Sequence, residues 1–161
     1  MLFRSDVALI DAIDDALTAA GADPSRLVFE LTETAAIGNM DNAKTFTNAV
    51  RSRGCRLALD DFGSGFGSFY YLKHLPFDYF KIDGDFIHGF DANTTDRLVV
   101  EAIVGIAKGM GKKTVAEFVT DQDMLDRLRR SGVDYAQGFH IGAPQPIAEI
   151  FVPTLSEGVS R

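Results

Sequence analysis

The sequence predicts an α/β protein, an incomplete (β/α) barrel of the TIM type with about five parallel strands and alternating helices. Short apolar runs alternate with longer segments whose apolar residues recur at helical spacing, and the connections between them are short. In addition, each of the five apolar runs ends in polar or charged residues. All strand ends meet at one rim in a barrel, whereas an open doubly wound sheet uses a single switch point. We therefore favour a barrel, although five strands do not close one.

The first half of the chain contains two helical patterns, each followed by an apolar run. Ile10, Ile13 and Leu17 lie at helical spacing before Gly21, and a second amphipathic segment ends at Gly54. Glycine just beyond an apolar stripe is a typical helix stop. The predicted elements are a helix over 5–20, a strand over Leu27–Leu31, a helix over 41–53 and a strand over Arg56–Leu59.

The second half repeats the alternation. A short apolar segment ends before Pro76, and a long helical stripe includes Leu98, Ala102 and Ile106. The predicted elements are helices over Phe66–His74, Thr95–Met110, Asp121–Arg130 and Ile147–Leu155, and strands over Tyr79–Ile82, Lys113–Ala116 and Val133–Ala136. We therefore expect one domain over residues 1–155 and a frayed tail over 156–161.

Composition limits the function classes. The 161 residues carry a net charge of −7 without a basic run, which argues against binding to a nucleic-acid polymer. A small phosphate-bearing ligand remains compatible if metal ions bridge it to carboxylates. The single cysteine, Cys55, rules out an internal disulfide and suits a reducing, cytoplasmic setting. No apolar run is long enough to span a membrane, so we expect no membrane contact within this chain, although attachment through other domains is compatible.

Two adjacent carboxylates, Asp60 and Asp61, stand where a predicted strand ends, before a loop rich in glycine and serine. Side chains alternate along a strand, so the two start on opposite faces, and a turn at Phe62–Gly63 would bring them together. Hard divalent cations prefer such oxygen ligands. The alternative is that the aspartates cap the following helix and the glycines form its turn.

The predicted rim gathers several further charges. Glu30, Glu33, Asp83 and Glu117 follow or end other strands, together with Lys81 and Gln137. Carboxylates packed so closely repel one another unless cations neutralise them. Two divalent metals are a common device for phosphodiester hydrolysis. Lys81 would orient or help to activate the attacking water, or alternatively form a structural salt bridge with an aspartate.

The ordered motifs resemble those of the EAL-domain family of cyclic di-GMP phosphodiesterases, over the C-terminal two-thirds of that domain. The matching segments are Glu30-Leu-Thr-Glu33, Asp60-Asp-Phe-Gly-Ser-Gly65, Lys81-Ile-Asp83, Ala116-Glu117-Phe-Val119 and Gln137-Gly138. The resemblance implies a modified TIM barrel that hydrolyses cyclic di-GMP to linear pGpG with Mg²⁺ or Mn²⁺.

Residue roles follow from the resemblance. It implies that Glu30, Asp60, Asp61 and Glu117 are metal ligands, with Lys81 and Glu117 acting on the catalytic water. A second set would support the substrate or the loop after the aspartate pair: Glu33, Asp83, Gln137, Phe139 and Pro144. Phe139 and Pro144 follow the last strand and are candidates for lining a guanine pocket.

The chain departs from the family pattern in ways that bear on activity. It contains neither the Glu-Ala-Leu strand nor the asparagine ligand, and Thr120 replaces a second glutamate. Phe118 stands where the family has glycine, and Gly67 where serine is common. We therefore expect this isolated fragment to be impaired or inactive. The alternatives are a non-catalytic cyclic di-GMP-binding signalling domain and a truncated barrel used for assembly. Open sheet edges also predict self-association.

Overall fold

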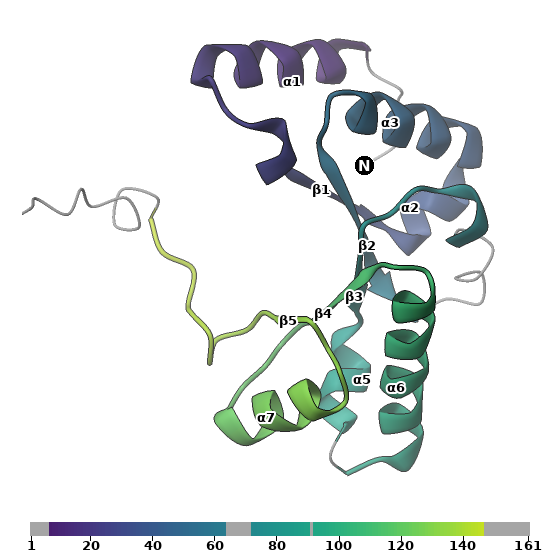
Figure 1. Cartoon of the computed structure of the whole chain (residues 1–161), viewed down its shortest axis with the longest axis vertical. Helices are drawn as coiled ribbons and strands as arrows, with labels where there is room; N and C mark the ends of the chain where they lie inside the picture. Colours follow the sequence, from purple (N-terminus) through teal and green to yellow (C-terminus); the bar gives the residue numbers. More distant parts are fainter. Residues whose placement is uncertain (1–6, 64–71, 91, 147–161) are drawn as a thin grey trace, which may run out of the picture.

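The structure, a computed structural model, describes residues 7–63, 72–90 and 92–146. Its five parallel strands form one sheet in the order β1-β2-β3-β4-β5, so each strand pairs with its neighbour in the sequence. Their bounds are Val28–Thr32, Arg56–Phe62, Tyr79–Ile82, Lys113–Ala116 and Tyr135–Ala136. Within the described part of the chain the sheet stays open at β1 and β5. The predicted incomplete barrel is therefore confirmed (Figure 1).

Helices connect successive strands and cover the outer side of the sheet (Figure 1). Asparagine and aspartate side chains begin three of the longer ones by accepting backbone N–H bonds, as Asn39, Asn93 and Asp121 do. The helices are α1 (Val7–Ala20), α2 (Glu33–Gly38), α3 (Met40–Ser52), α5 (Gly84–Gly89), α6 (Thr94–Gly109) and α7 (Gln122–Arg130), with a short 3₁₀ turn η1 (Pro24–Arg26).

Two short helices were not predicted. α2 and α5 each have six residues and follow β1 and β3 directly, at the rim. Thr32 begins α2 by accepting a hydrogen bond from Ala35 N at 3.3 Å. Asp83 begins α5 in the same way, at 2.9 Å from Asp85 N. Six residues are too few to establish a periodic apolar stripe, which explains why the sequence pattern did not reveal them.

Several predicted bounds shift by one residue, and larger differences concern three elements. β2 continues three residues beyond Leu59, whereas β5 begins only at Tyr135. Of the helix predicted over Phe66–His74, residues 72–74 are helical and 66–71 lie outside the described residues. The helix predicted over 147–155 and the tail over 156–161 also lie outside them.

The core lies between the sheet and its helices. Leu57, Ala58 and Leu59 of β2 are buried one after another, so both faces of this central strand are covered, as is usual for a parallel strand. Phe62 and Phe80 stack with ring centroids 5.1 Å apart, directly beneath the rim. This packing fixes β2 relative to β3, the two strands that carry Asp60, Asp61 and Lys81.

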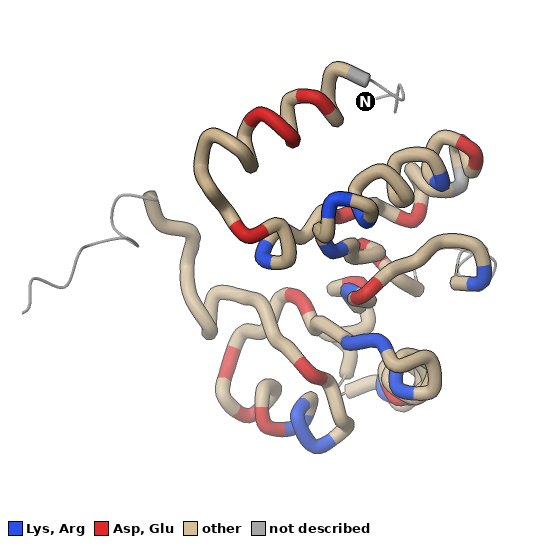
Figure 2. The backbone as a smooth tube through the Cα atoms, turned by 45° about the horizontal axis from the view of Figure 1, so that its top comes forward, with Lys and Arg blue, Asp and Glu red and all other residues tan. Residues whose placement is uncertain are grey.

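Basic positions are distributed over several helices and loops beside acidic ones (Figure 2). Among the residues that the structure describes, no helix combines the length and apolarity that crossing a bilayer requires.

Candidate metal centre

The two adjacent aspartates converge because β2 is irregular where they occur. Leu59 pairs with Phe80 and Phe62 with Ile82, so β2 uses one more residue than β3 over this stretch. Such a bulge interrupts the alternation of side chains. Asp61 adopts φ 55°, a left-handed conformation that aspartate tolerates better than most residues. The convergence therefore arises within the strand, rather than at the turn predicted at Phe62–Gly63.

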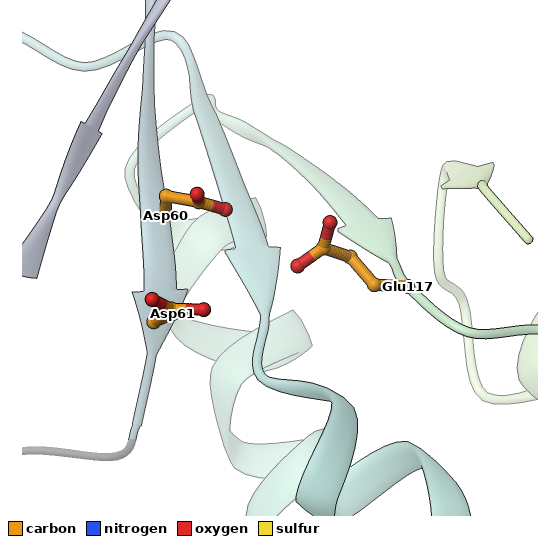
Figure 3. Close-up of side chains that lie close together, drawn as sticks. All are labelled: Asp60, Asp61 and Glu117. Carbon is orange, nitrogen blue, oxygen red and sulfur yellow. The ribbon is translucent and has the colours of Figure 1, made fainter.

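Asp60, Asp61 and Glu117 form a compact oxygen cluster (Figure 3). Each contributes one carboxylate oxygen, and these oxygens all lie within 4.8 Å of one another. Two oxygens on opposite sides of a bound Mg²⁺ or Ca²⁺ are about 4–5 Å apart, given typical metal–oxygen distances. The spacing and the all-oxygen donor set therefore fit a divalent cation.

Lys81 lies at the centre of the predicted acidic rim. Its Nζ donates a hydrogen bond to Glu30 Oε2 at 2.9 Å and lies 2.7 Å from Asp60 Oδ1 and 3.0 Å from Glu117 Oε1. The Lys81 side chain is only 7% exposed, whereas that of Glu30 is 49% exposed on the edge strand. Carboxylates from three separate segments thus converge on one ammonium group, instead of the single pair that a simple structural bridge would form.

Burial and charge set the ionisation of these groups. Burial alone would lower the pKa of Lys81, but hydrogen bonds to Asp60, Glu30 and Glu117 outweigh it and raise the pKa further above neutrality. Burial raises the pKa of Glu117 despite the nearby Lys81. Burial, and then the charge of Asp60, raise the pKa of Asp61. The rim therefore holds a protonated lysine beside two carboxyl groups, Asp61 and Glu117, whose pKa values are raised, and a bound divalent cation would favour their ionised forms.

Glu33 and Asp83 lie just outside this cluster. Glu33 is the first residue of α2 and only 2% exposed, and Asp83 caps α5. The negative charges of both oppose ionisation of Asp61 and add to its raised pKa, after burial and the charge of Asp60.

The remaining candidate residues, Gln137, Phe139 and Pro144, line a separate hollow beside Glu117. This pocket has a volume of about 400 Å³, within the usual range for small-ligand sites. Phe139 is 79% exposed, so a planar ligand has direct access to its ring. The pocket also includes His88 and Phe118, which sequence reasoning had not assigned to it.

The residue after Glu117 is unusual in its backbone. Phe118 adopts φ 55°, a conformation that costs a residue with a Cβ roughly 1–2 kcal/mol. The side chain is 56% exposed and its ring lies 5.5 Å from that of His88 on α5. The sequence did contain a sign of this unusual backbone, because Phe118 occupies a position where the EAL-domain family, which the chain resembles, has glycine.

Comparisons with known proteins agree with these motifs. A sequence model described as "EAL domain" matches residues 3–144. The cyclic di-GMP phosphodiesterase PdeB of Shewanella oneidensis is 48% identical over 126 residues, which are 78% of this chain and 15% of PdeB.

Solved structures show the same fold. The structure described as "PaMucR Phosphodiesterase, c-di-GMP complex" matches with a TM-score of 0.83 and 32% identity, over 92% of this chain and 62% of that one. The Klebsiella pneumoniae BlrP1 manganese/cy-diGMP complex at pH 9.0 matches with a TM-score of 0.77 and 29% identity, over 83% of this chain and 34% of BlrP1. The chain thus spans less than two thirds of each of these proteins.

Proposed function

The chain belongs to the EAL domain family, and we propose that its acidic rim binds a divalent cation and takes part in hydrolysing cyclic di-GMP to linear pGpG. The observation that carries the proposal is the cluster of Asp60, Asp61 and Glu117 around one small volume, with Lys81 in contact with two of them. The names of PdeB and PaMucR, and the manganese in the BlrP1 complex, support the same chemistry.

The proposed reaction breaks one phosphodiester of the cyclic dinucleotide. The oxygen of a water molecule bonds to phosphorus, the bond from phosphorus to the ribose 3′ oxygen breaks, and that oxygen receives a proton. Mg²⁺ or Mn²⁺, held by Asp60, Asp61 and Glu117 with Glu30 beside them, would neutralise the phosphate and polarise its oxygens.

Lys81 acts in this proposal as a donor of hydrogen bonds and not as a base. The raised pKa keeps its amine protonated at neutral pH, so it cannot accept a proton from water. Its ammonium group orients the water and offsets negative charge developing on the phosphate. Glu117, whose pKa is raised by burial and which contacts Lys81 at 3.0 Å, would accept the proton from the water.

The neighbouring pocket would hold a guanine base. Phe139 offers an exposed aromatic face, and Gln137 and Pro144 line the same hollow beside Glu117. A base seated there would bring its attached phosphate toward the acidic cluster, because Glu117 belongs to both the pocket and the cluster. Glu33 and Asp83 support the segments on either side of the aspartate pair.

A second candidate function is binding of cyclic di-GMP without turnover, as a signalling domain. Thr120 favours it, because this residue supplies no carboxylate where the family has a second glutamate. Its exposed hydroxyl instead donates a hydrogen bond to Asp121 Oδ2 at 3.1 Å.

Calorimetry and product analysis separate these functions. Cyclic di-GMP is titrated into the chain with and without Mn²⁺, and each mixture is then incubated and analysed for pGpG by chromatography. The hydrolytic proposal expects Mn²⁺-dependent pGpG that Asp60→Ala abolishes and Asp123→Ala, an exposed control on α7, retains. Binding without pGpG supports the signalling alternative. The proposal would be contradicted if the chain bound neither Mn²⁺ nor cyclic di-GMP. It would also be contradicted if Asp60→Ala formed pGpG as fast as wild type.

A further inference from the structure

The segment that carries Glu117 is held from two sides. On one side, backbone bonds tie it to the turn after β5: Gln137 N donates to Ala116 O at 2.8 Å, and Val119 N donates to Gln137 O at 3.0 Å. The backbones approach so closely here that a Cβ on Gly138 would lie 2.9 Å from the carbonyl carbon of Val119. These bonds join the backbone on either side of Phe118 to the turn after β5.

On the other side, the ring of Phe118 rests on α5. A Cβ added to Gly84 would lie 2.7 Å from Phe118 Cε2 and closer still to Cδ2. His88, four residues further along α5, contacts the ring with centroids 5.5 Å apart. Residues four apart share one face of a helix, so Gly84 and His88 together form the seat of the ring.

The glycine at position 84 has a steric reason. It is the first residue of α5, and its φ is not in the left-handed region. The turn itself therefore does not require glycine at this position. The close approach of the Phe118 ring does, because any Cβ there would occupy the same space.

The left-handed backbone at Phe118 lies immediately after Glu117. This conformation turns the chain between Glu117, which points toward the aspartates of β2 (Figure 3), and Val119, which is fully buried. A phenylalanine is strained in such a backbone, and here its ring is packed against Gly84 and His88 of α5. We propose that Phe118 is a positioning residue: its ring, seated at the gap left by Gly84, fixes the backbone turn that aims Glu117 at Asp60 and Asp61. The inference rests on the proposed role of Glu117 as a metal ligand.

Four variants of the full chain test the inference by Mn²⁺ affinity, measured from the electron paramagnetic resonance signal of free Mn²⁺. Gly84→Ala would displace the ring and weaken Mn²⁺ binding about tenfold, the scale of changes in residues that support metal ligands. Phe118→Gly would weaken it comparably, because a glycine backbone is free of the strain but has no ring that anchors the turn to α5. The double variant should bind like Phe118→Gly alone, because the added methyl group then meets no ring. Gly105→Ala is the control, since a Cβ there meets no atom within 4 Å.

The outcomes separate this inference from a structural role of the ring. The inference is supported if Gly84→Ala lowers the Mn²⁺ affinity and the double variant binds no more weakly than Phe118→Gly. It is overturned if both single variants bind Mn²⁺ like wild type. It is also overturned if the loss of affinity in the double variant equals the product of the two single losses. Thermal unfolding of each variant accompanies the titrations. If Gly84→Ala does not fold, the Phe118→Gly variant tests the inference. Weaker Mn²⁺ binding without a lower melting temperature supports the positioning role of Phe118, and unchanged Mn²⁺ binding overturns it.

A metal-free measurement keeps the inference distinct from the proposed function. Hydrogen exchange of the Val119 amide, which bonds to Gln137 O, should accelerate in Gly84→Ala but not in Gly105→Ala. If the wild-type chain binds no Mn²⁺, the proposed function fails. The exchange rate of the Val119 amide then still tests whether the Phe118 ring holds the turn. Equal exchange rates in both alanine variants would overturn it.

Discussion

Lys81 Nζ on β3 lies 2.9 Å from Glu30 Oε2 on β1, although β2 separates the two strands in the sheet. The same Nζ lies 2.7 Å from Asp60 Oδ1 on β2, the intervening strand. It also lies 3.0 Å from Oε1 of Glu117, the residue after β4. One buried ammonium group therefore links the ends of four consecutive strands. The acidic rim is assembled around an internal cation, and any bound metal must share its carboxylates with Lys81.

Replacing Lys81 tests this arrangement. Lys81→Met should lower the free energy of unfolding without metal by about 2–3 kcal/mol, less than for a fully buried pair because Glu30 is half exposed. Mg²⁺ should restore more stability to the variant than to wild type, since it binds the folded state and replaces the lost charge. Urea unfolding with and without Mg²⁺ measures both effects.

The control for Lys81 is Lys113→Met, which removes an exposed ion pair with Asp134 at 2.6 Å. Its cost should stay below about 1 kcal/mol, as for other surface pairs. Equal losses in the two variants, or no selective rescue by Mg²⁺, would contradict the central role of Lys81.

Replacing Asp61 should change the stability of the protein and its affinity for Mn²⁺ in opposite directions. Asp61→Gly should raise the free energy of unfolding without metal by about 1 kcal/mol, because glycine adopts φ 55° freely. The same change should weaken Mn²⁺ binding by removing a cluster oxygen. Asp60→Gly should weaken Mn²⁺ binding too but lower stability, since Asp60 has no positive φ to relieve. Urea unfolding and Mn²⁺ titration check these opposite signs, and a destabilised Asp61→Gly would refute the strain argument.

Acid stability should depend on Asp134 at the opposite end of the sheet. Burial opposes ionisation there, but hydrogen bonds from Lys113 and from the backbone and hydroxyl of Thr114 outweigh it and lower the pKa of Asp134. A lowered folded pKa stabilises the protein above the unfolded pKa, about 3.9, and the contribution disappears as pH falls through the folded value. The stability difference between wild type and Asp134→Asn should thus be constant above about pH 5 and shrink below pH 4. A difference that grows on acidification would contradict this assignment.

The open edge at β1 should promote self-association. Val28 on this strand is 40% exposed, and its neighbour Leu27 is 38% exposed. Unpaired edge strands bind other strands unless a charge or proline blocks them. Light scattering of wild type should show mass that rises with concentration, and Val28→Lys should reduce it, whereas Leu98→Lys, at an exposed site on α6, should not. A monomeric wild type at high concentration would contradict the prediction.

Much of the fold could be predicted because its strands and long helices have distinct local patterns. The apolar runs before Glu30, Asp60 and Lys81 identified three strands and the rim that they share. The bulge at Asp60 and Asp61 could not be predicted, because it depends on how β2 pairs with β3 and not on β2 alone.

The candidate site shows the same division. Sequence spacing indicated that the carboxylates would gather, but it did not determine whether Lys81 would contact one of them or three. Asp83 was interpreted only as a site residue, whereas it also begins α5 as its cap. The seat of Phe118 on Gly84 joins residues far apart in the chain and follows from packing alone.

The strand order, in which each strand pairs with the one before it, has a consequence for synthesis on the ribosome. A nascent chain emerges from its amino end at about 5–20 residues per second, so each new strand finds its neighbour already exposed outside the exit tunnel. Lys81 emerges after Glu30 and Asp60 and before Glu117. Its positive charge is therefore available to the growing polypeptide before the last acidic group of the cluster arrives.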